Sequence, residues 1–453
     1  MRLAISLLLY ASLFYSVLTS AQVIIPFAYW NCKLPASVAS DTLNADFVAG
    51  TTSNTTVSGA SVVLSAGQTT GTFTSRVFDV IGNCPTLSNW LSVSWKGSLP
   101  YGKLLPDYAS GAIQNETTTD YSNLSSSTFM SSIMGSWHFQ ELATGTAPGG
   151  KDFADSSGSG THGILNGGIT LNSVGKIGRA INFNGSTGYI NMGTPANITG
   201  LGNFSISFWI YPNNITTTQM IMYRTDNDIQ QGFWVAQSNT GQIIFQLINA
   251  STDSITKSVN TLPLSTWTHI VITTDGSLTS TNSKIYFNGV QATYTGAVNG
   301  SGAHTSAAAQ SLIVGQAGAS GWTIGATNYL NARLQELSFM GRQLTTAEII
   351  EEYRRGINRV KMQFRSCILS NCGDLPAWKG YDGTSTTFFT ELNNNSTQLN
   401  WLGTVLTSFP LMTFMNFPSA AIPNNRYFQY KATLETDNTT YLPDLKVITI
   451  KRP

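Results

Sequence analysis

Short apolar runs of strand length, separated by turn-forming residues, constrain the fold of this chain more than any other feature. Residues 204–210 read FSISFWI and begin with an alternation of apolar and polar side chains, the period of a β-strand. Residues 243–248 and 270–272 are apolar runs of similar length. Asn288-Gly289 predicts a two-residue hairpin turn, because both central positions of that turn need positive φ. The recurrence of such strands and turns predicts an all-β fold of packed sheets.

The composition narrows the class of protein. At 453 residues the chain is expected to contain two or three domains. Charged residues make up 10% of it, against roughly 25% in typical soluble proteins. The formal net charge is +1 and no Lys/Arg run occurs, which argues against nucleic acid and acidic membranes as partners.

The N-terminus predicts export. Arg2 is followed by an apolar stretch over residues 3–18 and by the small residues 19–21 before Gln22, the pattern of a secretory signal peptide over residues 1–21. The alternative is an uncleaved membrane anchor, but the apolar run is shorter than the ~20 residues of a spanning helix. We expect a secreted or cell-surface protein with no membrane span after cleavage.

Four cysteines follow the predicted cleavage site, at Cys32, Cys84, Cys367 and Cys372. An even number in an exported chain favours disulfides. The short spacing suggests a Cys367–Cys372 loop, with Cys32 and Cys84 as the other pair. A zinc site is the alternative, but none of the histidines (138, 162, 269 and 304) lies near these cysteines in the sequence.

One helix is predicted near residue 350. Thr345 and Glu348 have the spacing of a capping box, and an apolar stripe at 349, 350 and 353 follows. Gly356 is expected to stop the helix and to mark a domain boundary. The acidic residues at 348, 351 and 352 are expected to form a solvated face.

The order of motifs between residues 137 and 356 carries a family resemblance. The motifs lie at 137–139, 155–163, 204–212, 267–272, 285–290, 334–339 and 341–349. In this order they resemble the laminin-G-like, concanavalin A-like jelly-roll family. The resemblance implies a jelly-roll sandwich over residues 133–356, and a recognition module more often than an enzyme.

The flanks together resemble a β-sandwich module of exported bacterial proteins. Strand patterns occur at 71–79 and 90–95 before the jelly roll, and at 359–366, 425–434 and 443–450 after it. We therefore expect a discontinuous flanking β-sandwich made of residues 22–110 and 357–453, with 111–132 as linker. Insertion at an exposed loop is common because domain termini often lie close together. The alternative is three separate domains in a row.

Catalytic patterns are missing from the sequence. Hydrolases of the superfamily that the jelly roll resembles carry a Glu-x-Asp-x-x-Glu strand, since glycoside cleavage needs two carboxyl groups about 5–10 Å apart. The comparable strand at 334–337 has a single carboxylate, and no nucleophile elbow, zinc-protease motif or phosphate loop occurs. We expect a protein that is not an enzyme.

The resemblance also implies a structural calcium ion. In related jelly rolls an acid of the early loop and a glutamate of the late strand meet at one ion, which corresponds to Asp155 and Glu336 here. A carbonyl near Gly160 and, more weakly, Glu141 would add oxygen ligands of the kind that calcium takes.

A second interpretation of the same acids stays open. According to this alternative, Asp155 caps a turn and Glu336 pairs with Arg333 or Arg342. Gln335 stands where the family often has Asp.

Five residues are candidates for ligand binding: Trp234, Trp322, Tyr223, Asn227 and Gln246. Sugar-binding sandwiches stack aromatic rings on sugar faces and add polar side chains for the hydroxyls. Core packing is the alternative role of the tryptophans. The sequence thus favours an exported, non-catalytic binding protein for a glycan or another cell-surface ligand, with a role in adhesion. The alternative is a structural component of an extracellular or envelope assembly without a small ligand.

Overall fold

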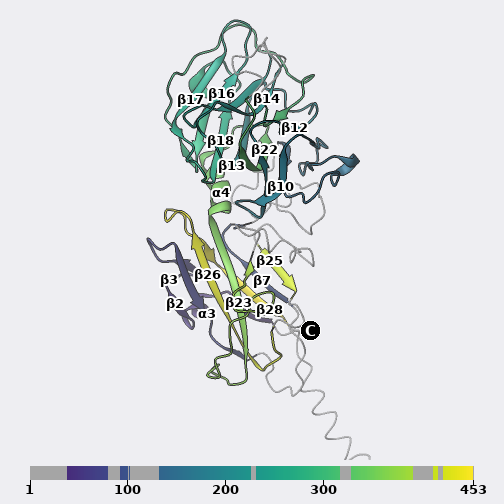
Figure 1. The fold of residues 1–453 in the computed structure, drawn as a ribbon. Helices are drawn as coiled ribbons and strands as arrows, with labels where there is room; N and C mark the ends of the chain where they lie inside the picture. Colours follow the sequence, from purple (N-terminus) through teal and green to yellow (C-terminus); the bar gives the residue numbers. More distant parts are fainter. Residues whose placement is uncertain are drawn as a thin grey trace, which may run out of the picture.

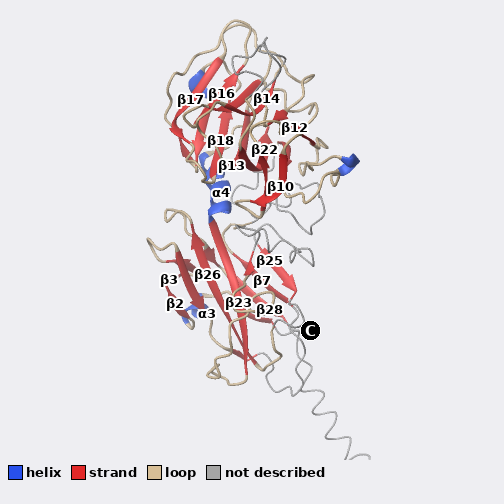
Figure 2. Ribbon diagram, viewed as in Figure 1, coloured by secondary structure: helices blue, strands red, loops and turns tan. Residues whose placement is uncertain are grey.

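The chain folds into two lobes, each built of β-sheets (Figure 1). The computed structural model describes residues 38–79, 92–99, 101–102, 132–225, 231–316, 328–390, 412–416 and 422–451. We call residues 132–357 the jelly-roll module, and residues 38–102 with 358–451 the flanking module. Strands predominate in both, as the expected all-β class requires (Figure 2). No helix in these residues is long and apolar enough to cross a membrane.

The jelly-roll module is a sandwich of two antiparallel sheets. The eight-stranded sheet has the order β10-β11-β22-β13-β18-β19-β20, with β8 paired to β22. The seven-stranded sheet has the order β17-β16-β15-β14-β21-β12-β9. The first sheet comprises β8 (Ile133–Trp137), β10 (Ile169–Val174), β11 (Arg179–Phe183), β13 (Phe204–Pro212), β18 (Thr268–Thr274), β19 (Lys284–Phe287), β20 (Val290–Gln291) and β22 (Ala332–Met340). The second comprises β9 (Ile164–Asn166), β12 (Tyr189–Asn191), β14 (Gln219–Arg224), β15 (Phe233–Gln237), β16 (Gln242–Leu247), β17 (Ser254–Thr261) and β21 (Ile313–Val314).

Strand β13 is buried on both of its faces. Phe204, Ile206 and Phe208 belong to the main hydrophobic cluster of the module. The alternate residues Ser207 and Trp209 are also buried, at 1% and 2% exposed. Helix α4 (Thr346–Ile357) accounts for this second burial, because Tyr353 stacks on Trp209 with ring centroids 5.9 Å apart. The alternation predicted from the sequence is therefore real, but its polar side does not face solvent.

Local signals predicted the hairpin and the start of the helix correctly. Asn288 and Gly289 have φ of 51° and 81°, the positive values expected for the turn between β19 and β20. Thr345 and Glu348 form the capping box at the start of α4. Two short 3-10 helices, Pro148–Gly150 and Ser280–Asn282, complete the helical structure of the module in its described residues.

Two expectations about α4 were wrong. The helix runs past Gly356 to Ile357, and a Cβ on Gly356 would lie 2.4 Å from Cζ2 of Trp209. The glycine therefore allows close packing and is not a stop signal. Glu348 and Glu352 are each 2% exposed and do not form a solvated face.

The flanking module combines strands from both ends of the chain. Its sheets have the orders β1-β28-β7-β25, β2-β5-β26-β23-β24 with β6 on β26, and β27-β4-β3. The N-terminal part supplies β1 (Val38–Asp41), α3 (Asn44–Val48), β2 (Thr51–Ser53), β3 (Thr55–Ser58), β4 (Ser61–Leu64), β5 (Thr70–Thr74), β6 (Phe78–Asp79) and β7 (Ser92–Lys96). The C-terminal part supplies β23 (Asn358–Cys367), β24 (Phe389–Thr390), β25 (Met412–Asn416), β26 (Tyr427–Thr436), β27 (Asp444–Leu445) and β28 (Val447–Lys451). In all three sheets, strands from before the jelly-roll module pair with strands from after it.

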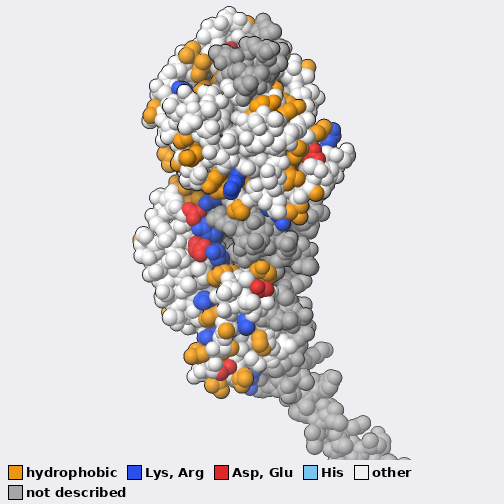
Figure 3. All heavy atoms as spheres, in the orientation of Figure 1, with side chains coloured by type: hydrophobic (Ala, Val, Ile, Leu, Met, Phe, Trp, Pro, Cys, Tyr) orange, Lys and Arg blue, Asp and Glu red, His pale blue; other side chains and the backbone are white. Residues whose placement is uncertain are grey.

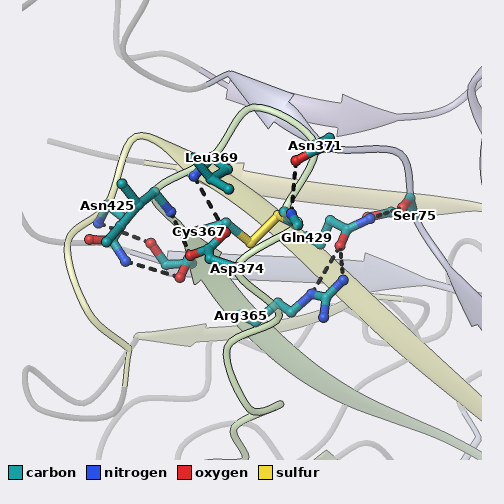
Figure 4. Close-up of a disulfide and its surroundings, with 12 residues drawn as sticks. Ser75, Arg365, Cys367, Leu369, Asn371, Asp374, Asn425 and Gln429 are labelled. Carbon is teal, nitrogen blue, oxygen red and sulfur yellow. Dashed lines mark hydrogen bonds between the residues drawn. A yellow bond between two sulfur atoms is a disulfide. The ribbon is translucent and has the colours of Figure 1, made fainter.

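The Cys367–Cys372 disulfide predicted from the sequence is present at the end of β23 (Figure 4). The Asp374 carboxylate accepts hydrogen bonds from the backbone N–H groups of Ile368 and Leu369 in the same loop. Cys32 and Cys84 lie outside the described residues, as does the predicted signal peptide at 1–21.

Candidate functional site

Three of the candidate ligand-binding residues lie side by side on the seven-stranded sheet. Tyr223 of β14 pairs with Trp234 of β15, and Trp234 pairs with Gln246 of β16. Directly opposite residues of neighbouring strands point to the same face, with Cβ atoms about 5 Å apart. They form one row across the sheet, which we call the aromatic row (Tyr223, Trp234 and Gln246). The candidates Asn227 and Trp322 lie outside the described residues.

The members of the aromatic row differ in exposure. Trp234 is 6% exposed, and packs in a small cluster with Met220, Ala236 and Ile248 on the outer side of the sheet. Tyr223 packs against this cluster and is only partly buried. The sequence placed Trp234 at a strand edge or in a loop, whereas it lies inside β15 in the middle of the sheet. The buried Trp234 therefore lies beside Tyr223 on the neighbouring strand, in the cluster against which Tyr223 packs.

Polar groups complete the row. Burial raises the pKa of the Tyr223 hydroxyl to about 12, and the nearby Tyr189 hydroxyl adds to the effect. Gln246 donates a hydrogen bond from Nε2 to Asp253, whose other carboxylate oxygen accepts from the backbone N–H of Asn249 at 2.8 Å. The row thus combines a partly exposed tyrosine with a Gln246 amide that is fixed in orientation and 8% exposed. Such a surface can contact the apolar face and the hydroxyls of one small polar molecule.

Asp155, a predicted calcium ligand, organises its own loop. Its carboxylate accepts hydrogen bonds from the backbone N–H groups of Ser136 (3.1 Å), Ser157 (2.9 Å) and Thr161 (2.9 Å), and the residue is fully buried. The backbone N–H of Asp155 donates to Nδ1 of His162. These bonds are what the turn-capping interpretation expects of Asp155.

Glu336 and Glu141 have partners of their own. Both carboxylate oxygens of Glu336 lie 3.1 Å from Nδ1 of His138. Glu336 has a φ of +52° in β22, where the register with β13 shifts, so a β-bulge directs this side chain. Glu141 accepts from the backbone N–H of Ala154, and burial raises its pKa, which favours the neutral carboxyl.

These residues do not make up a calcium shell as they are arranged. Across the described parts of the chain, no group of three or more His, Cys, Asp or Glu side chains is placed to hold a metal ion. Gly160, the candidate carbonyl ligand, lies in the Asp155 loop with a φ of +72°. Calcium binding at Asp155 and Glu336 stays a prediction.

A buried polar cluster lies under α4 and was not predicted from the sequence. Ser207 donates to Oε2 of Glu352 at 2.5 Å, and Nε2 of His269 lies 3.0 Å from the same serine oxygen. A catalytic triad places its serine and acid on opposite nitrogens of the histidine. Here both contact the Nε2 side, while Nδ1 has no hydrogen-bond partner within the described part of the chain. All three residues are at most 2% exposed, so the cluster supports the helix and does not meet a substrate.

The sequence of this module matches a known superfamily. Residues 184–350 match the Laminin_G_3 family model, described as the concanavalin A-like lectin/glucanases superfamily. This part of the chain is a concanavalin A-like domain. The match covers β12 through the first turn of α4 and thus includes the aromatic row. No curated protein matches the sequence.

Solved structures of binding domains resemble the chain at low identity. The receptor-binding domain of botulinum neurotoxin type G is 18% identical with a TM-score of 0.35, over 55% of this chain and 60% of that domain. The binding domain of botulinum neurotoxin DC, in complex with SialylT, is 14% identical with a TM-score of 0.38, over 60% and 64%. Domain 4 of an extracellular arabinanase from Geobacillus stearothermophilus, in complex with arabinotriose, is 21% identical with a TM-score of 0.36, over 48% and 97%. The chain spans less than two thirds of the length of the two neurotoxin structures.

Proposed function

We propose that this protein is an exported, non-catalytic binding protein whose jelly-roll module recognises a glycan, or another cell-surface ligand, at the aromatic row. The observation that carries the proposal is the register that sets Tyr223, Trp234 and Gln246 next to one another. Three residues selected from the sequence for ligand chemistry thereby share one face of one sheet. A superfamily described as lectins and glucanases supports a carbohydrate ligand.

The chemistry of the row suits a neutral sugar. The partly exposed Tyr223 ring can stack on the C–H face of a pyranose or furanose ring. The Gln246 amide, oriented by Asp253, can exchange hydrogen bonds with ring hydroxyls. The Ser207–His269–Glu352 cluster is buried and lacks triad geometry, which supports a role without catalysis. The predicted signal peptide and the Cys367–Cys372 disulfide support export.

A glycan array tests the proposal, with the full chain and a Tyr223→Ala variant. We expect selected oligosaccharides to bind, and Tyr223→Ala to weaken them about tenfold, equivalent to ~1.4 kcal/mol. Tyr427→Ala is the matched control, because Tyr427 is a partly exposed strand tyrosine of the flanking module. An array without specific binding, or equal losses for both variants, would contradict the proposal.

Calcium binding is a second proposal for the same module. The ion would have to compete with His138 for Glu336 and with three backbone N–H groups for Asp155. The chelation experiment given in the Discussion decides between an ion and the present hydrogen bonds.

A further inference from the structure

The two lobes are joined directly at one point of the chain. Helix α4 ends at Ile357 and β23 begins at Asn358, so no linker separates the modules there (Figure 1). Two backbone hydrogen bonds cross this junction, from the Asp437 N–H to Ile357 O at 3.1 Å and from the Gly102 N–H to Arg355 O at 2.8 Å. Side chains of α4 add contacts at the same junction: Arg354 donates to the Tyr101 hydroxyl and the Leu442 carbonyl, and Asn438 donates to the Tyr353 hydroxyl. A junction confined to one helix can act as a hinge, because domains of one chain move relative to each other unless their interface is large and hydrophobic.

The β10–β11 hairpin of the jelly-roll module makes a second contact between the lobes. Ile177, in its turn, is 1% exposed and belongs to the hydrophobic cluster of the flanking module. The neighbouring Lys176 forms an ion pair with Asp437, which follows β26. One turn thus presents an apolar and a charged side chain to the other lobe.

Glutamines of the jelly-roll module hold the turn in this shape. Gln335 accepts from the backbone N–H groups of Lys176 (2.8 Å) and Ile177 (3.1 Å) and donates to the Ile177 carbonyl. Gln140 donates to the same carbonyl at 2.8 Å and accepts from the Arg179 N–H at 2.8 Å. Because the backbone groups are satisfied within their own lobe, the side chains at 176 and 177 are already in place to contact the other.

The ion pair belongs to a larger charged group at the junction. Arg359 also pairs with Asp437 and with Glu435, and Glu435 pairs with Lys361. The Lys176 ammonium lies 5.6 Å from the Trp209 ring centroid, beside the aromatic stack of α4. In the space-filling view, side chains of both charges gather where the lobes meet (Figure 3). A shared network of this kind favours one relative orientation over its neighbours.

We propose that the hairpin turn of residues 175–178 is a latch that fixes the orientation of the jelly-roll module on the flanking module. The α4–β23 junction is the axis about which the lobes could rotate, and the latch is the second contact between them. While the latch is closed, the two lobes move as one body. Opening the latch would leave both sandwiches folded and free to rotate about residues 357–358.

Hydrogen exchange of the full chain tests the latch. We expect Ile177→Ser and Lys176→Met to speed the exchange of the Asp437 and Gly102 amides at least tenfold. Exchange in β13 and β18, the core of the jelly-roll module, should stay unchanged. Val174→Ser is the matched control, because Val174 lies on the same hairpin at 52% exposed.

Small-angle scattering adds a global measurement. Both latch variants should broaden the distribution of interatomic distances relative to the wild type, and the control should not. Unchanged exchange and scattering in either variant would overturn the proposal. Unfolding of the flanking module by Ile177→Ser would also overturn it, because Ile177 would then be an indispensable core residue and not a latch.

Discussion

Replacing Arg224 with methionine should destabilise the jelly-roll module strongly, although the described residues include no acid paired with this arginine. Arg224 is fully buried, and its guanidinium donates to four backbone carbonyls: Gln310 at 2.9 Å, Ala308 at 2.8 Å, Pro195 and Ile198. Burial lowers the pKa of Arg224 to about 10. The side chain ties the loop after β12 to the loop before β21, two neighbouring strands of the sheet that carries the aromatic row.

The magnitude follows from the number of carbonyls that lose a donor. An unpaired buried carbonyl costs about 1–3 kcal/mol, but neighbouring losses are not additive because the loops can relax and take up water. Because the four losses share two loops, we take about 3–5 kcal/mol for Arg224→Met, less than their simple sum. For a domain of this size such a loss lowers the melting temperature by roughly 6–20 °C.

Thermal unfolding of the full chain, followed by circular dichroism, measures the effect. Arg333→Met is the matched control, since Arg333 makes one 3.3 Å hydrogen bond to Val174 O and stacks on Tyr211. We expect the control to cost less than about 1 kcal/mol. If Arg224→Met melts within about 2 °C of the wild type, the carbonyl contacts contribute little and the reasoning is refuted.

Other features predict further outcomes. Gly356→Ala should cost about 1–2 kcal/mol in urea unfolding, because overpacking against Trp209 outweighs the helical preference of alanine, and a more stable variant would contradict it. The calcium proposal requires that EDTA lower the wild-type melting temperature and that Asp155→Asn abolish this response; an unchanged wild-type curve leaves Asp155 only its turn-capping bonds. Pairing of Cys32 with Cys84 predicts no titratable thiol in the denatured exported protein, and two thiols would contradict it.

The features predicted correctly are those set by neighbouring residues. The hairpin at Asn288 depends on two adjacent φ angles, and the start of α4 on a capping box four residues long. The alternation of apolar and polar side chains predicted strand β13, because successive side chains of a strand point to opposite faces. The tertiary contacts of these segments agree with their local preferences, so the local preferences predict the folded structure correctly.

The features missed depend on residues far apart in the sequence. The position of Glu352 among other acids predicted a solvent-exposed side chain. Its hydrogen-bond partner Ser207 lies 145 residues earlier, so the sequence around Glu352 does not indicate its burial. Gln335 stands where the resembled family often has an acid. Its role, accepting a hydrogen bond from the backbone N–H of Lys176, depends on a turn that lies far away in the sequence. The positive φ of Glu336 likewise follows from a bulge in strand pairing, which the sequence around it does not show.

The outer faces of the two sheets of the sandwich differ in what covers them. On the eight-stranded sheet, the outer side of β13 is covered by α4, with Ser207 and Trp209 beneath the helix that leads into the flanking module. That face is engaged in joining the lobes. On the seven-stranded sheet, Tyr223 is partly exposed. It lies beside Trp234, which in turn lies beside Gln246. Within the row, Tyr223 is therefore the member most open to a ligand, since Trp234 and Gln246 are 6% and 8% exposed, and Tyr223 is the residue at which to test for binding.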